Sequence, residues 1–213
     1  MLFKDRVDAG RRLAEALLSY KGQDVVVYAL PRGGVVVGAE IANALEAPLD
    51  LIIVRKVGHP FSSEYAVAAV GEDGDIVTNP PEVETIDERW FKERVRIEQQ
   101  EARRRRELYT CGRTPVSATG KIAIIVDDGL ATGLTMFAAV QEVSHSHPSR
   151  IVVAVPVAPP ETVERMKEIV DDVLVLYVTP GFGSIGSFYL QFDQVSDDEV
   201  IELLQSKRAG VPN

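Results

Sequence analysis

Short apolar runs rich in β-branched residues recur along this chain, and amphipathic stretches of helical length separate them. Each run predicts a buried strand, and the helical spacing between runs predicts βαβ units. Because crossovers of this length join parallel strands, we expect an α/β fold with a five-stranded parallel sheet flanked by helices. The predicted strands span 24–30, 49–55, 121–126, 150–157 and 172–178, and the predicted helices span 6–20, 35–45 and 133–143, with another starting at Pro160.

The composition narrows the class of protein. The chain has 213 residues, of which 46% are hydrophobic and 26% charged, which suits one globular domain over 1–213. The formal net charge of −9 argues against general nucleic-acid binding, because the phosphate backbone would repel the protein. The single cysteine, Cys111, forms no internal disulfide, and the sequence shows no signal peptide and no membrane-spanning run, so we expect a cytoplasmic protein without membrane association.

Three stretches interrupt the alternation of strands and helices. Residues 57–81 are rich in Gly, Pro, Ser and acids around an alternating segment, which predicts a long hairpin or mobile loop that projects from the sheet. Residues 86–109 are highly charged and have helical spacing. Residues 180–193 are rich in Gly and aromatic residues, so we expect them to cap one end of the domain.

The strand predicted at 121–126 ends in two adjacent acids, Asp127 and Asp128, and a turn of small residues follows. Ligands of open parallel sheets bind at the carboxyl ends of strands. Small residues at a helix N-terminus let several backbone N–H groups converge on one anion, and Thr132 and Thr135 add hydroxyl donors. The acids would repel a phosphate alone, so the pattern favours a ligand with a phosphate at one end and hydroxyls or a hydrated metal at the other, such as ribose 5-phosphate.

The run V-D-D-G-L-A-T-G-L-T at 126–135 resembles the signature of the type I phosphoribosyltransferases, which bind 5-phosphoribosyl 1-pyrophosphate (PRPP). The resemblance covers about 24–178 and implies that family's Rossmann-like fold. It implies that Asp127 and Asp128 hold the ribose hydroxyls and, through them or through water, a Mg²⁺ ion. The residues that it assigns to PRPP in this loop are Gly129, Leu130, Ala131, Thr132, Gly133, Leu134 and Thr135. The chain also looks like an uncharacterised bacterial and archaeal subgroup of predicted phosphoribosyltransferases.

A second loop, A-L-P-R-G-G-V at 29–35, also follows a strand and precedes a helix. It resembles the pyrophosphate loop of the same family, in which backbone N–H groups meet the diphosphate. Gly33 and Gly34 permit close approach of the backbone, and Arg32 adds a positive charge. The resemblance also implies a cis peptide bond somewhere within the segment from Pro31 to Gly33. Without the first motif, the segment would also fit an ordinary strand–helix turn.

The third segment begins with V-R-K-V-G-H and resembles the start of the family's mobile loop, which closes over the reacting centre and excludes water. The resemblance assigns Arg55 to PRPP binding and places Lys56 against the diphosphate, whose departure develops negative charge. His59 would either share that role or donate a proton. The alternative for His59 is a solvent-facing loop residue.

One departure from the family pattern bears on proton transfer. Enzymes of the family that use 6-oxopurines carry an Asp where this chain has Ala131, and the turn here is closer to that of the adenine enzymes. Those enzymes place a Glu-Tyr pair in the mobile loop, which Glu64 and Tyr65 resemble. We therefore expect Glu64 to be the general base or acid for the incoming nitrogen. The alternative is that Glu64 is an exposed acid of the hairpin.

The family's variable hood, here about 179–195, usually selects the base. Phe182, Phe188 and Tyr189 are candidates for stacking on a planar ring, although for any one of them a small hydrophobic lobe is the favoured interpretation. The Arg-rich stretch 89–106 allows three interpretations: a nucleic-acid surface, a contact with an acidic partner, or a solvated helix with internal ion pairs.

The expected function is transfer of a 5-phosphoribosyl group from PRPP to a nitrogenous base or related acceptor, with release of pyrophosphate. The resemblance implies Mg²⁺ as the cofactor, PRPP as co-substrate, a role in nucleotide salvage and a homodimer. The alternative is a PRPP- or nucleotide-sensing regulator with the same fold, which would keep the phosphate cradle without a working mobile loop. The sequence favours the enzyme because Lys56, His59 and Glu64 are all present.

Overall fold

A parallel five-stranded sheet forms the centre of the molecule, with strand order β2-β1-β6-β7-β8. The computed structural model describes residues 2–206, apart from the side chains of residues 63 and 64. Every neighbouring pair in this sheet is parallel, as the βαβ rhythm of the sequence predicts. The strands are β1 (Val25–Ala29), β2 (Leu49–Leu51), β6 (Ile122–Val126), β7 (Arg150–Ala158) and β8 (Asp172–Val178).

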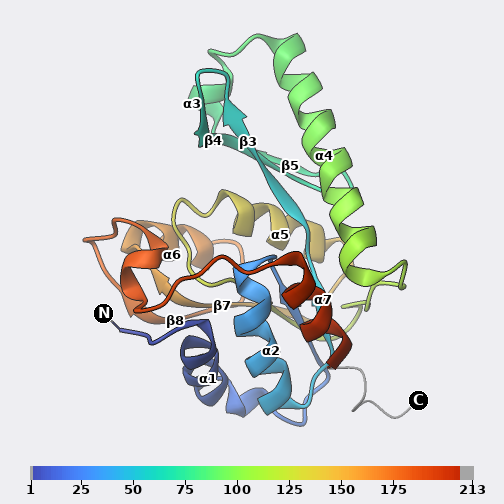
Figure 1. Cartoon of the computed structure of the whole chain (residues 1–213), viewed down its shortest axis with the longest axis vertical. Helices are drawn as coiled ribbons and strands as arrows, with labels where there is room; N and C mark the ends of the chain where they lie inside the picture. The colour runs from blue at the N-terminus through green and yellow to red at the C-terminus, as the bar shows by residue number, and fades with distance from the viewer. Residues whose placement is uncertain (1, 207–213) are drawn as a thin grey trace.

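Helices cover both faces of this sheet (Figure 1). Side chains alternate along each strand, so Val27 and Ile124 point to one core while Val26 and Ile125 point to the other. The first core also takes residues from α1, α2 and α7, and the second takes residues from α5 and α6. These helices are α1 (Arg6–Ala16), α2 (Gly33–Leu45), α5 (Leu134–Ser144), α6 (Pro160–Lys167) and α7 (Asp197–Ser206).

The central sheet and the helices on its two faces form the body of the molecule. A second, antiparallel sheet projects from this body and forms what we call the hairpin lobe, residues 54–83 (Figure 1). Val57, Val67 and Val70 make a small core there, with Phe91 and Val95 of the long helix α4 packed against it. The prediction of a projecting hairpin is therefore confirmed, and its mobility stays a prediction. The lobe consists of β3 (Val54–His59), β4 (Ser62–Gly71), β5 (Ile76–Thr78) and α3 (Pro80–Val83).

The single strand predicted at 49–55 is wrong. The central sheet keeps only Leu49–Leu51, and β3 of the hairpin lobe begins at Val54. Ile52 and Ile53 between them are buried, so the apolar run continues through the change of sheet. Both sheets bury β-branched residues equally well, and composition therefore gives no sign of where one strand ends and the next begins.

Helix α4 (Glu88–Thr110) runs from the hairpin lobe down to the body. The side chain of Asp87 accepts a hydrogen bond from the backbone N–H of Trp90, which caps the helix start. Ala102 and Tyr109 near the other end are fully buried in the core of the body. The charged stretch 86–109 is thus a helix, as predicted. Within residues 2–206 no helix is both long and apolar enough to cross a membrane.

Candidate active site

The candidate site is a cleft of about 530 Å³ at the carboxyl ends of β1 and β6. These neighbouring strands mark the point where the strand order reverses, which is where open α/β sheets bind ligands. The hairpin lobe and α4 close the cleft from the opposite side. The residues that were predicted from sequence and line this cleft are Arg32, Gly33, Arg55, Lys56, Asp127, Asp128, Gly129, Leu130, Ala131, Thr132, Gly133 and Thr135.

The two acids lie at the floor of this cleft. Asp128 is only 9% exposed, and its Oδ2 atom lies 2.7 Å from Nε of Arg6. Arg6 also donates to the carbonyl of Asp193 and lies over the ring of Phe192, so its position is fixed from the hood side. The buried hydroxyl of Tyr189 donates to the carbonyl oxygen of Asp128 at 2.6 Å. The acid pair is therefore held by side chains from both ends of the sequence.

Burial raises the pKa of Asp127 well above its ordinary value, and the neighbouring charge of Asp128 raises it further. Burial also raises the pKa of Asp128, although the guanidinium of Arg6 opposes this. Lys56 lines the same cleft, and its charge lowers the pKa of Asp127. A buried carboxyl beside a half-buried one therefore favours a site in which cations and hydroxyl donors surround them.

The predicted glycine loop packs directly against the acids, and it carries a cis peptide bond between Pro31 and Arg32, within the predicted segment. A Cβ atom at Gly33 would overlap Oδ2 of Asp128. A Cβ atom at Gly34 would lie 2.9 Å from both the Cα of Asp127 and the carbonyl oxygen of Val126. Only glycine permits this approach, which brings the N-terminus of α2 against the acid pair.

We expect Gly34→Ala to lower the free energy of unfolding by about 1–2 kcal/mol. The new methyl group meets backbone atoms, and such overpacking costs roughly 1–3 kcal/mol, while the better helix propensity of Ala offsets up to about 1 kcal/mol. Urea unfolding measures the change. The control is Gly181→Ala, where the nearest atom to the new Cβ lies 3.9 Å away. Equal stability of the two variants would contradict the close packing described above.

The loop after the acids leads into α5 as the sequence predicts. Gly133 has φ of 84°, a left-handed conformation that suits glycine, and α5 begins at the next residue. The N–H of Leu130 donates to Val157, and the hydroxyl of Thr162 donates to the carbonyl of Ala131, so β7 and α6 fix the loop from behind. The first N–H groups of a helix have no partner within the helix. The start of α5 therefore has, beside the acids, the geometry that favours an anion in helices generally.

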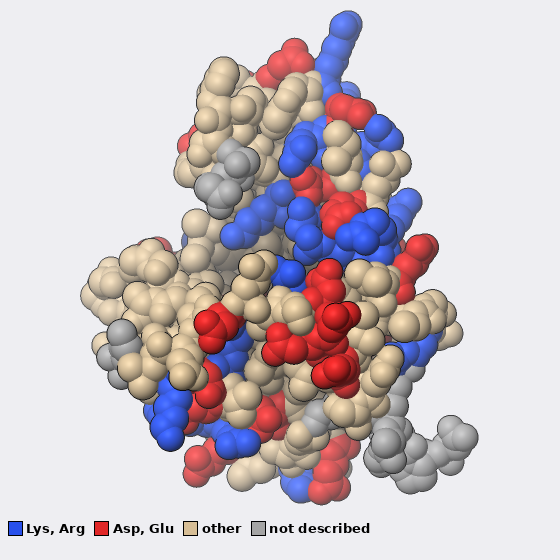
Figure 2. Space-filling view, viewed as in Figure 1, with Lys and Arg blue, Asp and Glu red and all other residues tan. Residues whose placement is uncertain are grey.

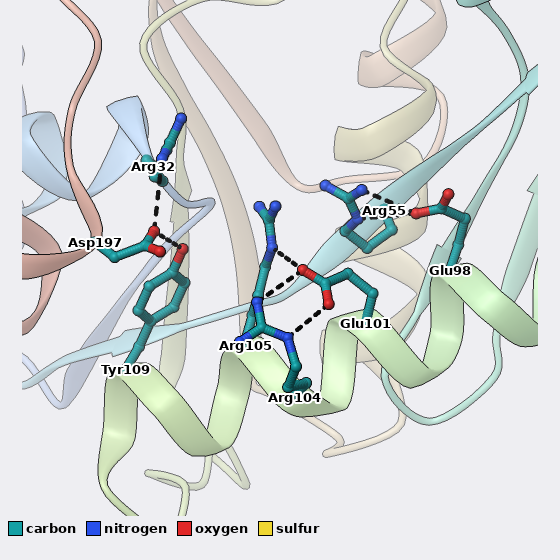
Figure 3. Close-up of polar contacts among 8 residues, drawn as sticks. All are labelled: Arg32, Arg55, Glu98, Glu101, Arg104, Arg105, Tyr109 and Asp197. Carbon is teal, nitrogen blue, oxygen red and sulfur yellow. Dashed lines mark hydrogen bonds and ion pairs between the residues drawn. The ribbon is translucent and has the colours of Figure 1, made fainter.

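Positive side chains also line the cleft, and Figure 3 shows two of them, Arg32 and Arg55, with their acidic partners. Arg55 of β3 pairs with Glu98 of α4, whose side chain also binds Arg94, and all three line the cleft. Arg32 of the glycine loop lies 3.6 Å from Asp197 at the start of α7. The hydroxyl of Tyr109 donates to the same carboxylate at 2.6 Å. Helix α4 and helix α7 therefore orient two of the guanidiniums that were predicted from sequence.

Several predicted site residues lie elsewhere. His59 sits at the far end of β3, where its Nδ1 accepts from the N–H of Phe61, and the cleft lining does not include it. The backbone of Glu64 lies in β4, but its side chain is outside the described residues. Leu134 is buried and turns toward a second groove.

The hood residues differ from one another in exposure. Phe182 lines the second groove, and its ring lies 5.3 Å from that of Phe188, which also packs on Tyr177. Tyr189 is 2% exposed and packs on Phe3, which fits the small hydrophobic lobe favoured from sequence rather than stacking on a base. Its place in an aromatic-rich segment suggested a binding surface, whereas the fold uses it to anchor the acid pair.

Three residues of the site were missed by sequence reasoning. Arg6 lies 122 positions from its partner Asp128, so no local pattern joins them. Arg94 and Glu98 were grouped with the other charges of a helix that has many of them. The only sequence signal for Glu98 is its place on the same helical face as Ala102, since four residues separate neighbours on one face.

A parallel sheet with its cleft at the switch point defines a doubly wound α/β protein. The sequence identifies the family within this class. The model of the phosphoribosyl transferase domain family matches residues 3–183, so this chain belongs to that family. The fold is also that of a solved structure. The crystal structure of TT1426 from Thermus thermophilus has a TM-score of 0.81 and 42% sequence identity, and the match covers 97% of this chain and 99% of that one.

A relative from Mycobacterium tuberculosis strain H37Rv, "Putative phosphoribosyl transferase Rv0571c", is 44% identical over 205 residues. The match takes in 95% of this chain but only 46% of the relative. An equal match exists to "Putative phosphoribosyl transferase MT0597" of strain CDC 1551. The chain thus spans about half the length of the curated relatives it matches.

Proposed function

We propose that this protein transfers a 5-phosphoribosyl group from PRPP to a nitrogen of a base or related acceptor and releases pyrophosphate. The observation that carries the proposal is the acid pair set between a glycine loop and a helix N-terminus in one cleft. The acids would accept hydrogen bonds from the ribose 2- and 3-hydroxyls. The N–H groups and hydroxyls of residues 131–135 would bind the 5-phosphate.

The acids also suit a Mg²⁺ ion that is held mainly by substrate oxygens. Within the described residues no group of three or more His, Cys, Asp or Glu side chains forms a metal cage. Mg²⁺ commonly binds through one or two carboxylates together with waters and substrate phosphates, and Asp127 and Asp128 match that pattern. When bound, Mg²⁺ would neutralise charge on the diphosphate.

The remaining cleft residues would act on the leaving group. Lys56 from the hairpin lobe and Arg32 from the glycine loop both line the cleft, and they would stabilise the diphosphate as negative charge develops on it. The hairpin lobe carries Lys56. Closure of this lobe would move the positive charge of Lys56 toward the diphosphate and would also exclude water from the cleft. Glu64 in the same lobe is proposed to take the proton of the incoming nitrogen.

A second groove, also about 530 Å³, is proposed to receive the acceptor. It lies between the hairpin lobe, α6 and the hood, and it shares Ala131 and Thr132 with the cleft of the acids. Tyr65 and Phe182 supply aromatic surface there, and Arg165 adds a charge. A planar base in this groove would lie next to the loop that holds the ribose phosphate.

The Arg-rich helix gives little support to nucleic-acid binding. Arg96 pairs with Glu93, while Arg104 and Arg105 both pair with Glu101 on the same helix. Acids of the helix itself therefore already balance these side chains, as in a solvated helix with internal ion pairs. Filter binding with RNA and DNA at physiological salt tests this, and retention of either would favour the regulatory alternative.

Incubation with PRPP, Mg²⁺ and a panel of bases, with pyrophosphate release as the readout, tests the proposed function. We expect release that depends on both the acceptor and Mg²⁺. A protein that binds PRPP but releases no pyrophosphate with any acceptor would instead fit a PRPP sensor.

For Glu64→Gln we expect kcat to fall about a hundredfold, within the range for loss of a general base, while the KM for PRPP changes little. The matched control is Glu84→Gln, an exposed acid elsewhere in the chain after α3. The pH dependence of kcat measured for both variants separates loss of a base from a change in folding. Unchanged turnover in Glu64→Gln would remove this residue from the mechanism.

A further inference from the structure

Glu98 is a buried carboxylate on the inner face of α4. It is 4% exposed, although α4 carries many charged residues that reach solvent. Its Oε2 atom accepts from Nε of Arg55 at 3.0 Å and lies 2.9 Å from the NH2 atom of the same guanidinium. Its Oε1 atom lies 2.6 Å from NH2 of Arg94. Each carboxylate oxygen therefore holds a different arginine, and the arginines come from two different elements.

The contacts with Glu98 use only part of each guanidinium. A guanidinium carries five N–H donors, and Glu98 engages one edge of Arg55 and one nitrogen of Arg94. Both side chains line the cleft and stay partly exposed, at 29% and 42%. The three residues together carry one net positive charge. A buried carboxylate with two arginine partners thus presents a pair of oriented donors to the cleft.

The location of the pair indicates its ligand. The glycine loop and the acids lie on the body, whereas Arg55 and Arg94 lie on the lobe side of the same cleft. Figure 2 shows Lys and Arg side chains gathered where α4 and the lobe meet the body, above an acidic area over α7. A diphosphate that starts at a ribose held by the acids and extends across the cleft would bring its outer phosphate to these arginines.

We infer that Arg55 and Arg94, held together by Glu98, form a subsite for the outer phosphate of a diphosphate group. Arg94 contacts the phosphate directly, and Glu98 is a positioning residue that acts through both arginines. This inference rests on the proposed function and adds to it a role for α4: the helix supplies one wall of the diphosphate site. Planar guanidiniums bind phosphate oxygens in pairs, which suits the doubly charged end of such a ligand.

The competing explanation is that the three residues only tie α4 to β3. The two explanations predict opposite changes in anion affinity for Glu98→Gln. This change removes a negative charge from the cleft, so a site governed by net charge alone would bind an anion more tightly. If Glu98 positions the arginines, the same change releases two guanidiniums that then repel each other, and the anion binds more weakly.

The experiment is calorimetric titration of the full chain with inorganic pyrophosphate and Mg²⁺ at fixed ionic strength. We expect Arg94→Gln to weaken pyrophosphate binding about tenfold, as for loss of a charge-assisted hydrogen bond. We expect Glu98→Gln to weaken it at least threefold despite the added positive charge. Ribose 5-phosphate, titrated in parallel, lacks the diphosphate and should bind both variants as tightly as it binds the wild type.

The matched controls are Arg96→Gln and Glu93→Gln, which remove the same charges from an exposed ion pair of the same helix. Neither should change pyrophosphate affinity by more than twofold. If Arg96→Gln weakens binding as much as Arg94→Gln, the effect is long-range charge and the inference is wrong. Unchanged affinity in Arg94→Gln, or tighter binding in Glu98→Gln, overturns it as well.

The design also separates this inference from the proposed function. Should Glu98→Gln fail to fold, as thermal unfolding would show, Arg94→Gln still decides, because its side chain is 42% exposed. A wild-type protein that binds neither pyrophosphate nor ribose 5-phosphate would overturn the proposed function and this subsite with it. A wild type that binds both, with Arg94→Gln indistinguishable from it, would overturn the subsite alone.

Discussion

Asp128→Asn weakens the binding of PRPP with Mg²⁺ at least tenfold, which is about 1.4 kcal/mol. The proposed site uses this carboxylate as an acceptor for a ribose hydroxyl, and hydrogen bonds to charged groups contribute about 1.5–3 kcal/mol. The amide keeps the shape of the side chain but loses its charge. It also loses the ion pair with Arg6 that holds this side chain in place.

Calorimetric titration with PRPP and Mg²⁺ measures this loss, and ribose 5-phosphate serves as a second ligand that shares the hydroxyls. Asp198→Asn is the control, since Asp198 is an exposed acid in the first turn of α7. The control should bind PRPP as the wild type does. Wild-type affinity in Asp128→Asn would refute the assignment of the acid pair to the ribose.

The second large effect concerns stability and involves a buried acid far from the cleft. Glu142 of α5 lies at the base of the hairpin lobe, where its Oε2 atom is buried and has no hydrogen-bond partner among the described residues. Burial raises its pKa to about 8, and the nearby charges of Glu72, Asp73 and Asp75 add to this, while Arg106 opposes it. The folded protein therefore keeps this carboxyl protonated at neutral pH.

The sign of the pH dependence follows from this raised pKa. Below the ordinary value of 4.5, Glu142 is protonated in both the folded and the unfolded state, and its favourable contribution is fully present. Between 4.5 and about 8 the unfolded chain releases the proton while the folded protein retains it. Stability then falls as pH rises, by about 1.4 kcal/mol per pH unit. From about pH 5.5 to about pH 8.5 we expect a loss on the order of 3 kcal/mol from this residue.

Urea unfolding of wild type and Glu142→Gln at both pH values tests this expectation. The neutral amide cannot ionise, so the variant should be the more stable protein at the higher pH and should show a flatter profile. Glu107→Gln removes a carboxyl from an exposed position of α4 and is the control. Parallel profiles for wild type and Glu142→Gln would show that Glu142 ionises normally in the folded state.

Local sequence patterns predicted the parts of the site that are contiguous in the chain. A strand, an acid pair and a helix N-terminus occupy 122–135 without interruption, so their relative placement follows from backbone geometry alone. The glycine loop was predicted for the same reason. A Cβ clash with Asp128 now explains why Gly33 is needed there, and that partner lies far away in sequence.

Patterns failed where two surfaces compete for the same kind of residue. The apolar run 49–55 serves two sheets, and the aromatic pattern of the hood did not say which of its three rings is interior, a place that Tyr189 takes. In both cases burial is the deciding property, and composition within one segment does not say which surface will bury it.

The sequence by itself determined the α/β architecture, the order of its βαβ units and the loop chemistry at the ends of two strands, because periodicity and turn chemistry are local properties. The tertiary structure alone decided which charges meet in the cleft. Arg6 reaches Asp128 from the first helix, and Glu98 reaches Arg55 from α4, across 122 and 43 positions. Such pairs form because packing brings distant elements together and leaves a buried carboxylate that requires a partner, a requirement that no segment of sequence expresses on its own.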